Sequence, residues 1–483
     1  MNREIKRVSI VVLAMFLALF VSTSIIQVGA ADSLNADARN SRTLYASYQV
    51  QRGSILVAGQ PVAESVPSKD TYNYQREYPQ GPLYSAATGF FPISGAPTGI
   101  EGAMNSELSG TSNDDFIDQL QNLVTGHHPQ GNSVELTIDP VAQQAAYDAL
   151  GSQQGSVVVL QPKTGRILAM VSKPDFDPNT LAVHNVTQVD ATYQKLLKAD
   201  GDPLINKTIN ELNPPGSTFK PVVLSAALES GNYTLSSQMP NPSSFTLPGT
   251  STVIHNDSFT SCGAGSTVSL ETALILSCNI PYAELAIKLG SQAIKTQAQK
   301  YGFNNSFSVP MHASASQYPG YSDQAKLAMS GFGQADDTAT ALQMAMNAAA
   351  ISNGGTVMQP NLVESVVTPD LQVRETFNPT TFGRATSETT ADSVAQTMVK
   401  DVSEGVASNA RIDGVQVGGK TGTAQNGTND PYTLWFTGFA PANDPQFAIA
   451  VVVDNGGGLG QRGDGNSVAA PIAKKVLEAV LGK

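Results

Sequence analysis

Cysteine and histidine are both scarce in this chain. Its 483 residues include only two cysteines, Cys262 and Cys278, and five histidines. Neither a CxxC spacing nor an HxxxH pair occurs, and these are spacings that zinc sites use. The sequence therefore predicts no metal site. The two cysteines either form a disulfide in an oxidising compartment, worth about 3 kcal/mol, or remain two buried free thiols.

Charged side chains are also few, and the basic ones are outnumbered. Only 14% of the residues are charged, and 28 Lys and Arg stand against 40 Asp and Glu, which gives a net charge of -12. Binding to nucleic-acid phosphates needs clustered Lys and Arg, so nucleic acid is excluded as a partner. The length allows two or three domains, because one domain usually takes about 100–200 residues.

A long apolar run follows the basic N-terminus "MNREIKR". It extends over residues 8–28, and a helix needs roughly 20 apolar residues to span a bilayer, so we predict a transmembrane anchor over residues 8–30. The basic flank predicts a cytoplasmic N-terminus and an extracytoplasmic catalytic domain in a single-pass protein of the cell membrane. The alternative is a signal peptide cleaved before Ala31. The length of the run exceeds the usual signal core of about 7–15 residues and favours a retained anchor.

The composition of the chain changes near residue 133. Residues 32–132 are rich in Ser, Gly, Pro, Asn and Tyr, which indicates a separate N-terminal domain. Within it, "NDDFIDQLQNLV" predicts a helix capped by Asn113, and "TGHHPQGNS" predicts a linker. Residues 133–483 form the second predicted domain.

The second domain begins with strands, continues with helices and ends with strands. "PVAQQAAYDALGS" predicts a helix that starts near Pro140, and "GSVVVLQPKTGRILAMVSKP" predicts a hairpin. Late in the chain, "VQVGGKTGTAQ", "YTLWFTGFAP" and "QFAIAVVVDN" predict strands, and "VAAPIAKKVLEAVLG" predicts a final helix. This order indicates an α+β fold, with an antiparallel sheet assembled from both ends of the domain and flanked by helices.

Ser217 and Lys220 lie in "PPGSTFKP", where a stiff turn leads into an apolar helical pattern. Residues three apart on a helix share one face, and a serine needs an adjacent base to become a nucleophile. A lysine can be that base if burial or another cation lowers its pKa. Taken alone, however, the pair is more typical of a serine that caps a helix and a lysine exposed to solvent than of a catalytic pair.

Two further motifs favour a catalytic role for Ser217 and Lys220. Ser277-Cys278-Asn279 follows about 60 residues later, and Lys420-Thr421-Gly422-Thr423 lies on a predicted strand. The order Ser-x-x-Lys, Ser-x-Asn, Lys-Thr-Gly is the motif set of penicillin-interacting serine enzymes. An earlier Lys163-Thr164-Gly165 precedes Ser217 and lies in a hairpin turn, so only Lys420 qualifies. The GxGxxG at Gly458 is followed only by the final predicted helix, and the further strand of a dinucleotide site, with its acidic residue, is missing.

The chain resembles the class B penicillin-binding proteins, the monofunctional D,D-transpeptidases of bacterial cell-wall synthesis, and within them the penicillin-binding protein A group of actinobacteria. The resemblance extends from Leu136 to the final helix, through "PPGSTFKP", "SCN", "GKTGTAQ" and "WFTGFAP". "RGSI" at Arg52 and "GIE" at Gly99 match the family's N-terminal pedestal, although the usual stretch after "RG-x-I" is missing. The resemblance implies a penicilloyl serine transferase fold with an elongated pedestal or dimerisation-type domain and one transmembrane helix.

The resemblance also implies roles for the motif residues. Ser217 would form an acyl-enzyme with a stem peptide and release the terminal D-alanine, and Lys220 would act as its general base. Ser277 would relay a proton to the leaving amine. Asn279 would hold Lys220 and the substrate amide. Lys420 would keep Lys220 deprotonated through like-charge repulsion.

The strand carrying Lys420 would bind the substrate carboxylate. This role falls to Thr421, Gly422 and Thr423. The backbone N–H groups of Ser217 and Thr423 would form the oxyanion hole. β-Lactams would acylate the same serine, and the mechanism requires no metal or cofactor.

Other functions fit the same motifs. A D,D-carboxypeptidase or a β-lactamase shares the acylation and uses water as the acceptor. An inactive scaffold or a β-lactam sensor is a minor alternative. The resemblance implies stem peptides, wall-synthesis and division proteins and the membrane as partners, and a role in cell division and cell shape. A bond between Cys262 and Cys278 would shape the mouth of the active-site cleft.

Overall fold

The computed structural model describes residues 2–30, 34, 48–111, 130–257 and 260–483. Helix α1 (Asn2–Ser24) continues into a π-helical turn, η1 (Ile25–Gly29). Within residues 3–29, an 18-residue window has a mean hydropathy of 2.5 and is not buried against the rest of the chain, so this helix is long and apolar enough to cross a membrane. It indicates a single-pass membrane protein. The helix expected from Asn113 and most of the linker that follows it lie outside the described residues.

Five strands form the central sheet of the larger domain. In spatial order they are β15 (Gly418–Ala424), β16 (Thr433–Ala440), β17 (Phe447–Val453), β5 (Gly155–Leu160) and β6 (Ile167–Lys173). All four pairings are antiparallel. The early β5–β6 hairpin therefore lies beside the last strand of the chain, which confirms the α+β fold with a sheet assembled from both ends.

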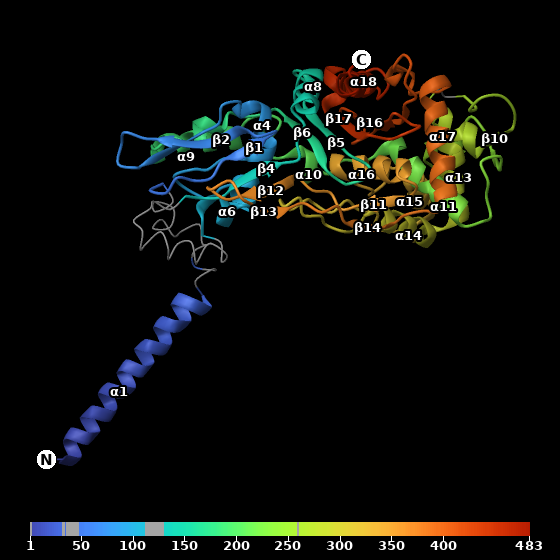
Figure 1. Ribbon diagram of the computed structural model, residues 1–483. Helices are drawn as coiled ribbons and strands as arrows, with labels where there is room; N and C mark the ends of the chain where they lie inside the picture. The colour runs from blue at the N-terminus through green and yellow to red at the C-terminus, as the bar shows by residue number, and fades with distance from the viewer. Residues whose placement is uncertain (1, 31–33, 35–47, 112–129, 258–259) are drawn as a thin grey trace.

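Both faces of this sheet are covered by helices. Helices α8 (Pro140–Leu150) and α18 (Ala469–Val480) lie on one face, and α16 (Ala341–Ser352) lies on the other (Figure 1). Alternate residues of β17 enter two different core clusters: Ile449, Val451 and Val453 on the α8 and α18 side, and Ala448, Ala450 and Val452 on the α16 side. This double burial explains why β17 reads as a continuous apolar run.

The predicted start of α8 is confirmed by its cap. Asp139 accepts a hydrogen bond from the backbone N–H of Ala142 at 2.9 Å, and Pro140 occupies the first helical position, where its missing N–H costs little. The predicted hairpin turn is also present, and Gly165 in that turn has a φ of +79°. Local sequence chemistry alone specifies both features.

A helical region lies beside β15 at the end of the molecule opposite the pedestal (Figure 1). Its helices are α11 (Lys220–Glu229), α12 (Leu270–Ile275), α13 (Asn279–Leu289), α14 (Ser291–Tyr301), α15 (Gln324–Ser330) and α17 (Glu388–Glu404). Helix α17 packs on β15, and α11 is buried between α13, α14 and α17. The remaining short strands of this domain are β7 (Gln238–Pro240), β8 (Phe245–Thr246), β9 (Val253–Ile254), β10 (Thr267–Ser269), β11 (Thr356–Met358) and β14 (Thr381–Arg384).

The pedestal contains a second, six-stranded sheet. In order, its strands are β13 (Val373–Thr376), β12 (Val363–Val367), β4 (Ser133–Leu136), β1 (Ile55–Val57), β2 (Gln60–Pro67) and β3 (Tyr74–Glu77). Strand β4 pairs in parallel with β1 and antiparallel with β12. The sheet thus takes strands from both sides of residue 133, and the domain boundary at that residue stays a prediction. Helices of this region and its surroundings are α4 (Gly81–Thr88), α5 (Gly99–Ala103), α6 (Asn105–Ser109), α9 (Val186–Leu197) and α10 (Lys207–Asn210).

The two pedestal motifs meet in a buried ion cluster. Glu101 of "GIE" accepts from Nε of Arg52, of "RGSI", and from Nε of Arg76, both at 2.6 Å. Tyr78 donates its hydroxyl to the same carboxylate at 3.1 Å. Burial alone would raise the pKa of Glu101, but Arg76 and Arg52 lower it, so the carboxylate stays ionised. The cluster ties α5 to β3 and to the chain entering β1.

Candidate active site

Ser217 lies in a short 3₁₀ turn, η4 (Gly216–Phe219), that leads directly into α11. Gly216 adopts a φ of +54° and donates its N–H to the carbonyl of Gly333 at 2.9 Å. Trp435 fixes the preceding turn, because its Nε1–H donates to the carbonyl of Pro214 at 3.0 Å. The rigid "NPPG" segment therefore holds the serine at a defined position, where it is 8% exposed.

Lys220, the first residue of α11, joins the first motif to the second. Its Nζ donates to the carbonyl of Ser277 at 2.6 Å, to Asn279 Oδ1 at 2.9 Å and to Ser277 Oγ at 3.3 Å. The side chain is fully buried. The hydrogen bonds among the described residues include none from Lys220 to Ser217. The amine is thus held on the Ser277 side of the site.

The backbone of Ser277 has an unusual conformation. Ser277 lies between α12 and α13 with a φ of +55°, a region that non-glycine residues seldom adopt. Both its carbonyl and its hydroxyl contact Lys220 in this conformation. Such strain costs of order 1–3 kcal/mol and persists where the surrounding structure enforces it, most often at functional sites.

Lys420 forms a buried ion pair with Asp401 that the sequence did not predict. Its Nζ lies 3.3 Å from Asp401 Oδ2, and both side chains are fully buried. Asp401 Oδ1 accepts from the backbone N–H of Ala407 at 3.0 Å. A signal was present in the sequence, because Asp401 continues the buried face of α17 that includes Val394 and Met398. An acid at such a position predicts a buried partner.

The electrostatics of the site favour a neutral Lys220. Burial lowers its pKa well below the ordinary value, and the charge of Lys420 lowers it further. Asp257 and Asp401 act in the opposite direction. Burial raises the pKa of Asp401, an effect that Lys420 opposes. The site therefore holds one lysine suited to act as a base and a second lysine paired with an acid.

The Lys-Thr-Gly strand lies against the nucleophile turn. A Cβ on Gly422 would lie 3.0 Å from the carbonyl oxygen of Pro215 and 3.1 Å from Thr218 Cγ2, so glycine permits this close approach. Thr423 Oγ1 accepts from the backbone N–H of Gly465, and Thr421 is 7% exposed. The glycine-rich loop before Gly465 thus borders β15.

The earlier Lys-Thr-Gly copy lies in the β5–β6 turn. There Lys163 forms an exposed ion pair with Asp444 at 2.8 Å. This contact accounts for Lys163 without any role in the site.

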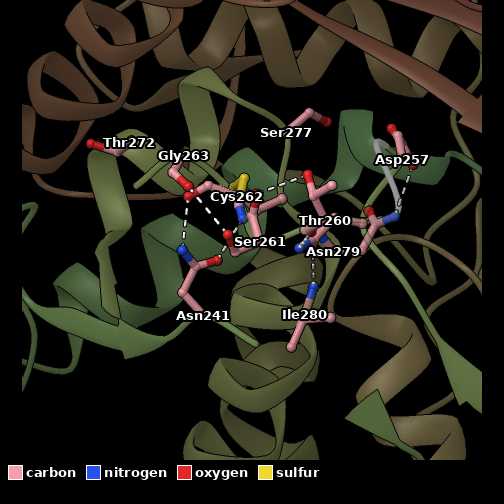
Figure 2. Close-up of a disulfide and its surroundings, with 12 residues drawn as sticks. Asn241, Asp257, Thr260, Ser261, Cys262, Gly263, Thr272, Ser277, Asn279 and Ile280 are labelled. Carbon is pink, nitrogen blue, oxygen red and sulfur yellow. Dashed lines mark hydrogen bonds between the residues drawn. A yellow bond between two sulfur atoms is a disulfide. The ribbon is translucent and has the colours of Figure 1, made fainter. Parts of the chain in front are cut away.

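Cys262 and Cys278 form a disulfide, one of the two alternatives that the sequence allows, with Cα atoms 5.8 Å apart (Figure 2). The bond ties the loop between β9 and β10, described at residues 255–257 and 260–266, to the start of α13. Asn256 strengthens the same junction, because its Oδ1 accepts from the N–H groups of Asn279 and Ile280 at 2.9 and 3.1 Å. The disulfide therefore lies immediately beside Ser277 and Asn279, where it supports the second motif.

Asn279 connects this loop to Lys220. Its Oδ1 accepts from Lys220, while its Nδ2 donates to Asp257 Oδ1 at 3.0 Å and to the carbonyl of His255 at 3.2 Å. Figure 2 shows the Asp257 and Asn279 side chains facing each other. Among the described residues, no group of three or more His, Cys, Asp and Glu side chains could hold a metal ion.

The comparisons with known proteins agree with this geometry. Residues 155–478 match the penicillin binding protein transpeptidase domain, and residues 52–134 match the penicillin binding protein A dimerisation domain. Peptidoglycan D,D-transpeptidase PbpA of Mycolicibacterium smegmatis is 38% identical over 490 residues, which cover 100% of this chain and 99% of that protein.

Solved structures of penicillin-binding protein A from Mycobacterium tuberculosis are similar over most of the chain. The ceftriaxone acyl-enzyme complex has a TM-score of 0.87 at 36% identity and covers 90% of this chain and 100% of its own. The penicillin G acyl-enzyme complex has a TM-score of 0.84 at 36% identity, and the match covers 89% of this chain and 100% of the chain in the complex. With its two matched domains and its three assembled motifs, the chain belongs to the class B penicillin-binding proteins.

Proposed function

We propose that this protein is a peptidoglycan D,D-transpeptidase that cross-links stem peptides through an acyl-enzyme on Ser217. The observation that carries the proposal is the buried Lys220 amine, held by Ser277 and Asn279 next to a second lysine. A neutral amine in this position is the base that a serine nucleophile needs. The mycobacterial relatives, named as transpeptidases and solved as β-lactam acyl-enzymes, support the same activity.

In the acylation step, Ser217 Oγ attacks the carbonyl of the penultimate D-alanine while its proton passes to Lys220. The peptide bond then breaks, and the departing amine of the terminal D-alanine takes a proton by way of Ser277, whose Oγ is 3.3 Å from Lys220 Nζ. The contact between Lys220 and Ser217 that this transfer needs would form with substrate bound, since catalytic hydrogen bonds are often long in free enzymes.

Strand β15 provides the groups that bind charge on the substrate. Thr421 and Thr423 bind the terminal carboxylate, and Gly422 keeps the strand close to the nucleophile turn. The N–H groups of Ser217 and Thr423 stabilise the oxyanion, which is usually the largest single contribution in acyl transfer. Lys420 keeps Lys220 deprotonated through its charge.

The second half-reaction distinguishes the alternatives. In a transpeptidase, an amine of a neighbouring stem peptide attacks the acyl-enzyme, its proton returns to the Lys220–Ser277 pair, and Ser217 is released. A D,D-carboxypeptidase or a β-lactamase would use water. The match to a dimerisation domain and the apolar N-terminal helix support the transpeptidase, because a soluble hydrolase needs neither.

The N-terminal helix supports a location at the outer surface of the cell membrane. We place the N-terminus in the cytoplasm and the catalytic domain outside, because basic residues precede the apolar run. The pedestal would contact other wall-synthesis and division proteins. These assignments rest on charge and on the family.

The direct test is intact-mass spectrometry of residues 32–483 incubated with benzylpenicillin, beside a Ser217→Ala variant. We expect a stable adduct of one penicillin that the variant lacks. Rapid return to the unmodified mass, with penicillin consumed, would instead identify a β-lactamase. Neither adduct nor turnover would contradict the enzymatic proposal and favour an inactive scaffold.

A further inference from the structure

Asp257 is an exposed carboxylate at the edge of the candidate active site. Its Oδ1 accepts from Asn279 Nδ2 at 3.0 Å, and Asn279 in turn contacts the buried amine of Lys220. Within the part of the chain that the structure describes, no lysine, arginine or histidine forms an ion pair with Asp257. Its charge is therefore not neutralised by a neighbouring side chain.

The position of this carboxylate is fixed although the residue is exposed. The preceding residue, Asn256, is buried and holds the N-terminus of α13 through its side chain. The hydrogen bond from Asn279 Nδ2 holds the Asp257 carboxylate itself. These contacts of Asn256 and Asn279 thus place Asp257 beside Asn279.

The other charges of the site are already paired or suppressed. Lys420 pairs with Asp401, and burial favours the neutral form of Lys220. Asp257 and Asp401 are the acids that act electrostatically on Lys220, and only Asp257 faces solvent. The edge of the cleft next to Asn279 is therefore negative.

We propose that Asp257 determines specificity by favouring acyl donors that carry a cationic group beside the acyl amide. The proposal rests on the proposed function and on the role that the family resemblance implies for Asn279, which is to hold that amide. The amide carbonyl of the donor replaces Asp257 Oδ1 on Asn279 Nδ2, and the released carboxylate meets an ammonium group on the adjacent carbon. The preferred acyl donors are then β-lactams whose acyl side chain carries an ammonium group on that carbon.

The test uses three penicillins that differ at one carbon of the acyl side chain. Ampicillin carries an ammonium group there, benzylpenicillin a hydrogen and carbenicillin a carboxylate. Second-order acylation rate constants are measured for residues 32–483 with and without Asp257→Asn. This substitution removes the charge but keeps an oxygen that can accept from Asn279.

In the variant we expect acylation by ampicillin to slow, and acylation by carbenicillin to accelerate, each by about two- to fivefold, the range for one exposed charge pair. The rate with benzylpenicillin is the reference for the other two, because it carries any common change that the lost charge causes through Lys220. Added salt should reduce the preference of the unaltered protein for ampicillin, because the interaction is exposed and is screened.

Two variants serve as controls. Asp257→Glu keeps the charge and should retain part of the preference. Asp392→Asn removes an exposed acid from the middle of α17, and its three rate constants should match those of the unaltered protein.

The possible outcomes separate this proposal from the general function. If Asp257→Asn changed the acylation rate constants of all three penicillins by the same factor, or changed none of them, the role of Asp257 would be overturned. The transpeptidase proposal would still stand. A failure of the unaltered protein to react with benzylpenicillin would overturn the proposed function itself. If Asp257→Asn lowered the melting temperature, the benzylpenicillin rate and the Asp257→Glu data would still decide the question.

Discussion

Lys220 and Lys420 are two fully buried lysines whose charges are handled differently. Lys420 has Asp401 at 3.3 Å, whereas Lys220 has only neutral hydrogen-bond acceptors, Ser277 and Asn279. A buried cation without a counter-charge loses its proton more easily, so the pKa of Lys220 falls well below the ordinary value. The same fold thereby produces one lysine suited to act as a base and one lysine paired with an acid.

This contrast predicts the pH dependence of acylation. The rate should rise with pH as Lys220 loses its proton and reach its plateau well below the ordinary lysine pKa. Lys420→Met removes a charge that lowers the pKa of Lys220, so the rising limb should move to higher pH. Asp401→Asn removes a charge that raises this pKa, so the limb should move to lower pH. Stopped-flow acylation with benzylpenicillin between pH 5 and about 10 measures both limbs, since that window brackets a lysine pKa lowered from its usual value.

Opposite shifts in the two variants distinguish electrostatics from simple damage to the site. Shifts in the same direction would contradict the assignment of Lys220 as the titrating base. The lowered pKa of Lys220 also predicts how the stability of the protein depends on pH. Between this lowered pKa and the ordinary lysine pKa, the unfolded chain binds a proton at Lys220 that the folded chain does not. Stability should therefore rise with pH through this window.

The loop between β9 and β10 acts as an element that supports the second motif. Its anchors are the Cys262–Cys278 disulfide and the Asn256 side chain, and both end at the first turn of α13. Ser277, immediately before this turn, holds a φ of +55° that needs support from its surroundings. The loop thus enforces the backbone that presents Ser277 to Lys220.

Replacing both cysteines by serine should lower the free energy of unfolding by about 3 kcal/mol, the cost of releasing a loop of this length. The acylation rate should fall as well, because Ser277 loses part of its support. Urea denaturation and benzylpenicillin acylation measure the two effects, and reduced unaltered protein is the matched control. Unchanged stability and rate in both samples would refute a supporting role for the disulfide.

The whole molecule is joined through the pedestal sheet. Strands β12 and β13 come from residues after 360 in the chain, yet they extend the sheet formed by β1 to β4. Residue Ile55 of β1 is fully buried and pairs with Val134 of β4. The catalytic domain and the pedestal therefore share one sheet and are not linked by a simple hinge.

A fragment of residues 133–483 should consequently be less stable than residues 32–483. Without β1, strand β4 loses its parallel partner and the apolar side chains that pack on β1 are exposed to water. We expect a lower melting temperature in calorimetry and a greater tendency to associate in size-exclusion chromatography. Equal melting temperatures for the two proteins would show that the domain beginning at residue 133 folds independently.

Local chemistry in the sequence determined the main elements and the motif residues. The Asp139–Pro140 cap, the turn at Gly165 and the apolar run of β17 each follow from residues close in the chain, and the structure has them as expected. The order of the three motifs identified Ser217 and Lys220 before any contact was known. These features depend on short-range sterics and hydrogen bonding, which a linear sequence specifies.

Only the tertiary structure decided which charges meet. Asp401 lies 19 positions before Lys420 and Asp257 lies 22 positions before Asn279, and nothing in either spacing specifies contact. The pairing of β12 with β4 joins residues more than 200 positions apart. Such contacts arise when helices and strands pack, because burial brings distant side chains together and electrostatics then selects their partners. The sequence thus determined the three motifs, and packing determined the buried environment that lowers the pKa of Lys220.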